Sequence, residues 1–158
     1  MAPDLEGVVR FDQAMVGVAL AAGVTAGLGM GHNTTAAVIT RGLAEITRLG
    51  VAVGAEQATF YGLAGVGDLV LTCNASLSRN RTVGYRLGQG ESLEEILSDM
   101  TAVAEGVKTT EAAYELASQH EVEMPITEKM YAIVHEGHDP SKALRALMTR
   151  DPKSEEWS

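Results

Sequence analysis

The sequence predicts a single all-α domain, on three observations. Aromatic residues make up only 4% of the 158 residues whereas hydrophobic residues make up 46%, so the core must be built from Ala, Val, Leu, Ile and Met. Small and straight-chain residues of this kind favour helices over sheets. Apolar residues also recur at helical steps of three or four. Finally, no segment alternates as a half-buried strand would, and no linker divides the chain.

The first predicted helix spans residues 12–30 and is rich in Ala, Val and Gly. Its glycines at positions 17, 23 and 27 each cost about 1 kcal/mol of helix stability relative to Ala, so this helix needs tertiary packing to hold it. Glycine also lets a neighbouring element approach closely. We therefore expect this helix to be buried and central.

Capping residues and apolar stripes locate the remaining helices, which bring the predicted total to seven or eight. Asn33 is predicted to cap the second helix, which has one polar face with Arg41, Glu45 and Arg48 and an apolar stripe with Ala36, Ile39, Leu43, Ile46 and Leu49. Further helices are predicted at 58–61, from about 68, at 78–87, after a Ser92–Glu95 capping box, at 109–120, from Pro125 to Gly137, and from Asp139–Pro140 to about 150. Residues 101–105 are ambiguous, with extended backbone as the expectation, and the last eight residues are expected to fray.

Charge and composition exclude several classes of function. The formal net charge of −9 disfavours binding to nucleic acid and to anionic membrane surfaces. No apolar run reaches the ~20 residues that span a bilayer, and the first residues do not resemble a signal peptide. The single cysteine, Cys73, excludes an intrachain disulfide and fits a reducing compartment. We expect a cytoplasmic protein.

The strongest candidate for a functional site lies in residues 62–84, GLAGVGDLVLTCNASLSRNRTVG. Glycines at 62, 65 and 67 allow a tight turn, and Asp68 then stands near a helix start. Asp68 has two readings: a structural helix cap, or an acceptor for a ligand hydroxyl. The glycines do not form a dinucleotide fingerprint, because no βαβ unit surrounds them.

A second cluster, Ser78–Arg79–Asn80–Arg81, gathers donors at a predicted helix N-terminus. Free backbone amides and the helix dipole favour an anion there, and arginine adds a forked donor that matches phosphate oxygens. The alternative is that Ser78 only caps the helix while both arginines are solvated. Spacing alone leaves these alternatives open.

The histidines and the cysteine carry weaker signals. His135 and His138 lie three residues apart, but no further ligand pair is evident, so a role at a helix C-terminus is favoured and no metal site is predicted. Cys73 has no evident activating neighbour and is expected to be a buried structural residue.

Several long segments together resemble one family. GLAGVGDLVLTC with SRNR, NTTAAVITRGLAEITRLG, VAEGVKTTEAAYELA and EVEMPITEKMYAIV are similar to the bacterial-type NAD(P)-dependent glycerol-3-phosphate dehydrogenases, in matching order from about Asp4 to Pro152. The resemblance implies the all-helical C-terminal domain of the 6-phosphogluconate/glycerol-3-phosphate dehydrogenase fold over residues 1–158. It also implies glycerol 3-phosphate or dihydroxyacetone phosphate as the ligand and NAD(P) as the family's cofactor.

The resemblance also implies roles for particular residues. By motif match, Asp68, Ser78, Arg79 and Asn80 correspond to substrate-binding positions, and Arg79, Val103 and Glu105 correspond to cofactor contacts. If this assignment is right, Arg79 and Asp68 should face a shared cavity.

Two departures from the family matter. The sequence contains no glycine-rich βαβ unit, so we expect no N-terminal Rossmann domain in this chain and no stable NAD(P) binding by it alone. An ungapped alignment places FDQAMV where the family carries GGALKN, so Met15 stands at the catalytic lysine position. A thioether cannot exchange a proton with a substrate hydroxyl, and Met15 is expected to fill the core instead. We therefore name no catalytic residue.

Two functional hypotheses follow. In the first, the chain is the substrate domain of a glycerol-3-phosphate dehydrogenase that retains phosphate affinity but does not turn over alone. In the second, it is a non-enzymatic helical module that forms a homodimer or binds another protein through exposed apolar surface.

Overall fold

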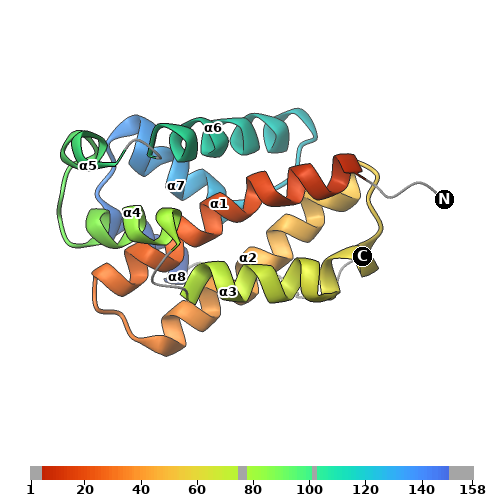
Figure 1. Cartoon of the computed structure of the whole chain (residues 1–158), viewed down its shortest axis with the longest axis horizontal. Coiled ribbons are helices and arrows are strands. Elements are labelled where there is room, and N and C mark those ends of the chain that lie inside the picture. The colour runs from red at the N-terminus through yellow and green to blue at the C-terminus, as the bar shows by residue number, and fades with distance from the viewer. Residues whose placement is uncertain (1–4, 75–77, 101–102, 150–158) are drawn as a thin grey trace.

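The computed structural model describes residues 5–74, 78–100 and 103–149, and within these ranges the chain is helical with no β-strand (Figure 1). The all-α prediction is confirmed. The elements are α1 Leu5–Gly27, α2 His32–Ala52, the 3₁₀ turn η1 Gln57–Tyr61, the π-helical turn η2 Leu63–Gly67, α3 Asp68–Asn74, α4 Arg79–Gly88, α5 Leu93–Asp99, α6 Val103–Gln119, α7 Pro125–Glu136 and α8 Pro140–Thr149.

Helix α1 is the central element of the domain. It packs against α2, α3, α4, α6 and α7, and in Figure 1 it crosses the middle of the molecule between α6 and α3. From Ala14 to Val24 its apolar side chains are almost fully buried except those of Met15 and Val16, which are partly buried. The expectation of a buried, central first helix is therefore confirmed, although the helix begins seven residues earlier than predicted and ends three residues earlier.

Glycines set the spacing between α1 and α4. A Cβ atom added to Gly84 of α4 would overlap the carbonyl oxygen of Leu20, and one added to Gly23 of α1 would overlap the carbonyl oxygen of Arg81. Gly27 and Gly88 extend the same contact by one turn in each helix. The two backbones therefore touch directly, which a side chain at these positions would prevent.

Most predicted helix boundaries hold. The Ser78 hydroxyl accepts a hydrogen bond from the Arg81 amide at 3.3 Å, and the Ser92 hydroxyl accepts one from the Glu95 amide at 3.2 Å. At α8, the Asp139 carboxylate accepts a hydrogen bond from the Ser141 amide at 2.8 Å. Gly137 ends α7 with a φ of 70°, which glycine adopts without strain.

Two local predictions are wrong. Asn33 does not cap α2: the helix begins at His32, and its N-cap is Gly31 with a φ of 88° and no side-chain cap. Residues 103–105 are not extended, because α6 begins at Val103; residues 101 and 102 lie outside the described part of the chain.

Two arginines of α2 donate hydrogen bonds to the C-terminal part of the domain. Arg41 donates a hydrogen bond to the Leu147 carbonyl near the end of α8 at 2.8 Å, and Arg48 donates to the Glu123 carbonyl just before α7 at 2.9 Å. Glu45 lies between these arginines and is buried. None of the helices that the structure describes is long and apolar enough to cross a membrane.

Candidate functional site

The glycine-rich turn forms a π-helical turn, η2, that leads directly into α3. A Cβ on Gly65 would overlap the backbone carbonyl of Phe60, so the turn folds tightly back onto η1. Asp68 is the first residue of α3, and its side chain is exposed. π-Helical turns are rare and occur often at functional sites, which makes this start of α3 a notable feature of the backbone.

The donor cluster lies at the start of α4, as the sequence predicts. Ser78 is the N-cap, and Arg79 and Asn80 are the first two residues of the helix. The first-turn amides of a helix point outward from its N-terminus and favour an anion. The Arg81 side chain is directed toward the end of α3, because its Nε donates a hydrogen bond to the Cys73 carbonyl at 3.1 Å.

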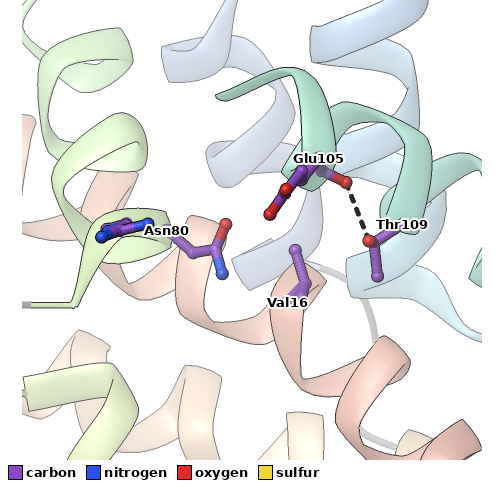
Figure 2. A pocket seen from close by; sticks show the side chains of 6 residues that line it. Val16, Asn80, Glu105 and Thr109 are labelled. Carbon is purple, nitrogen blue, oxygen red and sulfur yellow. Dashed lines mark hydrogen bonds between the residues drawn. The ribbon is translucent and has the colours of Figure 1, made fainter. Parts of the chain in front are cut away.

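A cavity of about 150 Å³ opens beside this cluster. It lies where three helices meet, with one wall from each: α1, α4 and α6. Figure 2 shows the Asn80 side chain reaching from α4 toward α6, with Val16 of α1 on a second side and Glu105 of α6 on a third. The lining residues are Val16, Arg79, Asn80, Glu105, Gly106 and Thr109.

The cavity presents one cation, one amide and one carboxylate. Arg79, Asn80 and Glu105 make no side-chain hydrogen bond or ion pair with the residues that the structure describes. Thr109 is already engaged, because its hydroxyl donates to the Glu105 backbone carbonyl at 2.8 Å. The unengaged arginine and amide can therefore bind an anionic ligand, and the Glu105 carboxylate can accept a hydrogen bond from a ligand hydroxyl.

The structure brings together some of the predicted site residues and not others. Arg79, Asn80 and Glu105 line the same cavity, whereas Asp68 and Ser78 are not among its lining residues. Arg79 thus shares its cavity with an acidic residue of α6 rather than with Asp68. Val103 is the first residue of α6, and its side chain lies outside the described part of the structure.

Three lining residues were missed from the sequence: Val16, Gly106 and Thr109. Thr109 follows Glu105 by four residues, so helical spacing would have placed it beside Glu105 if residues 103–109 had been predicted as helix. Gly106 is the next residue after Glu105 in the chain, and helical spacing alone does not put the two on one face. Val16 follows Met15, which is partly buried and packs against the hydrophobic core. No local signal marks Val16, because an apolar residue in an apolar helix is expected to be core.

The histidines and the cysteine lie apart from this cavity. His135 contacts the Val107 carbonyl at 3.3 Å and stacks on Tyr131 with ring centroids 4.6 Å apart. Cys73 is buried, and burial raises the pKa of its thiol to about 12, which makes it a poor nucleophile. Among the described residues, no three His, Cys, Asp or Glu side chains are grouped to hold a metal ion.

Comparison with known sequences identifies the family. The model of the NAD-dependent glycerol-3-phosphate dehydrogenase C-terminus matches residues 15–145. The chain is 61% identical over 140 residues to the glycerol-3-phosphate dehydrogenase [NAD(P)+] of Geobacter sulfurreducens, covering 89% of this chain and 42% of the relative. It is 64% identical over 138 residues to that of Geobacter metallireducens, covering 87% and 41%. The chain thus spans less than half the length of these relatives.

Solved structures give the same result. A glycerol-3-phosphate dehydrogenase from Coxiella burnetii superposes with a TM-score of 0.90 at 41% identity, over 94% of this chain and 46% of that one. The glycerol-3-phosphate dehydrogenase GPD1 of Saccharomyces cerevisiae superposes with a TM-score of 0.80 at 28% identity, over 93% and 43%. This chain belongs to the NAD-dependent glycerol-3-phosphate dehydrogenase family and carries its C-terminal domain.

Proposed function

We propose that the cavity between α1, α4 and α6 binds a three-carbon phosphate ester, glycerol 3-phosphate or dihydroxyacetone phosphate. The proposal rests on the observation that Arg79 and Asn80 line one cavity at the N-terminus of α4. Neither side chain makes a hydrogen bond or ion pair with another described residue. A guanidinium and an amide beside a helix N-terminus together suit a phosphate. Glu105 would accept a hydrogen bond from a hydroxyl of the three-carbon chain.

Asp68 and Ser78 belong to this proposal by family resemblance. Ser78 directly precedes Arg79, and its hydroxyl oxygen is used as the cap of α4, accepting from the Arg81 amide. Its hydroxyl hydrogen can still be donated to a phosphate oxygen. Asp68 is exposed at the start of α3 and does not line the cavity, so its hydrogen bond to the hydroxyl that reacts in the family is proposed on the resemblance alone.

The same cavity does not suit a whole dinucleotide. Its volume of about 150 Å³ is below the roughly 300–1,000 Å³ of pockets that enclose drug-sized ligands. Arg79 and Glu105, two of the family's cofactor contacts, would touch only part of NAD(P). These 158 residues contain no glycine-rich βαβ unit to hold the pyrophosphate, so we propose that they do not bind NAD(P) stably on their own.

We further propose that these 158 residues do not turn over alone. Met15 stands at the position of the family's catalytic lysine, and a thioether neither takes nor gives a proton. Its partial burial against the core supports a packing role. The assay is NADH oxidation with dihydroxyacetone phosphate: we expect a rate equal to that of a heat-treated sample, and a clear excess over that sample would overturn this part of the proposal.

Calorimetric titration with glycerol 3-phosphate tests the binding proposal. We expect saturable binding to the native chain and loss of about tenfold or more in affinity in Arg79→Ala, because a hydrogen-bonded charge contact is removed. Arg145→Ala is the matched control, since Arg145 is exposed on α8 and outside the cavity lining. Equal affinities for all three proteins, or no binding to the native chain, would contradict the proposal.

A second candidate function is self-association. Large apolar side chains are exposed on α3 and η1: Leu71 is 66% exposed, Tyr61 47% and Val70 42%. Exposed apolar patches are common association sites, and a homodimer through α3 would cover Leu71. Light scattering across a concentration series tests this candidate: dimerisation should be lost in Leu71→Asp, and a monomer at every concentration would exclude it.

We also propose a cytoplasmic location. Cys73 is a free, buried thiol, which is compatible with a reducing compartment. Fractionation of the native host with detection of the chain by antibody tests this location, and recovery in a secreted fraction would contradict it.

A further inference from the structure

Gly106, in the first turn of α6, is packed against the side chain of Asn80 on α4. A Cβ atom added to Gly106 would lie 2.8 Å from Oδ1 of Asn80, closer than real Cβ atoms approach an oxygen. Apart from its own helix backbone and chain neighbours, no other described atom lies within 4 Å of that position. The Asn80 amide therefore occupies the space that a side chain at Gly106 would need.

Asn80 and Gly106 also line two cavities at once. Both residues line the site cavity of about 150 Å³ and a second cavity of about 10 Å³. The remaining lining of the small cavity is apolar: Leu20, Val83, Leu93, Val107 and Val134. Figure 2 shows Asn80 reaching across from α4 toward the first turn of α6. The contact between the two residues thus lies where the two cavities adjoin.

The small cavity offers no alternative place for the amide. Its volume of about 10 Å³ is hardly enough for one water molecule, and the side chains that line it, other than that of Asn80, are apolar. A polar group moved into an apolar space without a hydrogen bond loses its solvation. If a side chain at position 106 displaced the Asn80 amide, the amide would have to turn into the site cavity, between Arg79 and Glu105.

We propose that Gly106 is a positioning residue: by lacking a side chain, it holds the Asn80 amide against α6 and keeps the site cavity open for a phosphate ester. This inference rests on the proposed function for the identity of the ligand. The claim about Asn80 itself rests only on the contact with Gly106. It assigns a role to Gly106 that the resemblance to the family did not supply.

The Gly106→Ala variant tests the proposal. We expect affinity for glycerol 3-phosphate to fall about tenfold, because one hydrogen bond to a charged ligand is lost and the cavity is narrowed. The melting temperature should stay unchanged or rise, because Ala favours a helix over Gly. Ser118→Ala, exposed near the end of α6, is the control and should bind like the native chain. Native affinity in Gly106→Ala would overturn the proposal.

A double-mutant cycle with Asn80→Ala separates positioning from a general effect on the helix. If Gly106 acts through Asn80, then Gly106→Ala should weaken binding in the native background and change it less than twofold in the Asn80→Ala background. An equal loss in both backgrounds would show that the added methyl group acts directly on the ligand or on α6, and the positioning role would be rejected.

A ligand-free measurement keeps this inference separate from the proposed function. In the native chain, nuclear Overhauser contacts are expected between the Asn80 side-chain amide protons and the α-protons of Gly106. In Gly106→Ala these contacts should give way to contacts with the Val16 methyl groups. If glycerol 3-phosphate does not bind at all, the proposed function fails while this result still decides the position of Asn80. An Asn80 amide that stays in place despite the new methyl group would overturn the inference.

Discussion

The Glu45 carboxylate, on α2, accepts two hydrogen bonds from Thr127 of α7: one from the backbone amide at 3.0 Å and one from the hydroxyl at 3.1 Å. The backbone amide of Ile126 donates a third at 2.9 Å. Glu45 and Thr127 are each only 1% exposed. A side chain 82 positions away in the sequence therefore caps α7, whose own N-cap, Met124, offers no side-chain hydrogen bond.

Removing this carboxylate should destabilise the domain. Glu45→Ala would leave the amides of Ile126 and Thr127 without their acceptor in a buried place, which costs about 1–3 kcal/mol of unfolding free energy. Chemical denaturation monitored by circular dichroism measures this loss. Glu115→Ala, exposed on α6, is the control and should change stability far less. A Glu45→Ala chain as stable as this control would show that water replaces the cap.

The buried carboxylate should also make stability depend on pH. Burial raises the pKa of Glu45 from 4.5 to about 7, against the opposing effect of the hydrogen bonds from Ile126 and Thr127 and the charge of Arg48. The folded chain then binds a proton more tightly than the unfolded chain between these two values. Because the native state holds more protons there, stability falls as pH rises from about 4.5 to 7 and levels off above 7.

The Glu45→Gln variant isolates this effect, because other titrating groups contribute equally to both proteins. The native unfolding free energy, relative to that of Glu45→Gln, should fall by up to about 1.4 kcal/mol per pH unit between pH 5 and 7. Denaturant titrations at pH 5, 6, 7 and 8 measure the difference. A difference that is constant, or that rises with pH, would mean that the carboxylate is ionised throughout this range.

The direct backbone contact between α1 and α4 predicts a strong effect of a single methyl group. In Gly84→Ala the new Cβ would overlap the Leu20 carbonyl, and because backbone cannot rotate away, the helices must separate, at about 1–3 kcal/mol. Gly62→Ala is the control, because a Cβ there has no described neighbour within 4 Å. Thermal unfolding should show a lower midpoint only for Gly84→Ala, and equal midpoints would rule out the close crossing.

Local sequence signals predict most of the helix caps, because a cap depends on residues close in the sequence. Ser78, Ser92 and Asp139 cap the helices that they were expected to cap, since a cap depends on residues two or three positions away. The prediction that Asn33 caps α2 is wrong because Gly31, with its positive φ, is the N-cap and α2 begins two residues earlier than expected. At the start of α6, packing of Val107 against the core outweighs the weak helix preference of the segment.

The same local signals do not predict contacts between residues that are far apart in the sequence. The spacing of Glu45 beside Arg41 and Arg48 indicates a polar helix face, yet Glu45 is buried because α7 places its N-terminus there. Likewise, the glycines of α1 predict a close neighbour without identifying α4 as that neighbour. Arg79 and Glu105 meet in one cavity because α4 and α6 lie beside each other, and only the family resemblance linked these two residues beforehand.

The central claim is that a phosphate ester binds between α1, α4 and α6, and amide chemical-shift mapping with glycerol 3-phosphate tests it most directly. Our account predicts saturable shifts that are largest at Arg79, Asn80 and Gly106, and no comparable shifts with glycerol, which lacks the phosphate. Shifts that are absent, that are equal with glycerol, or that are centred on another face such as α8 would contradict it.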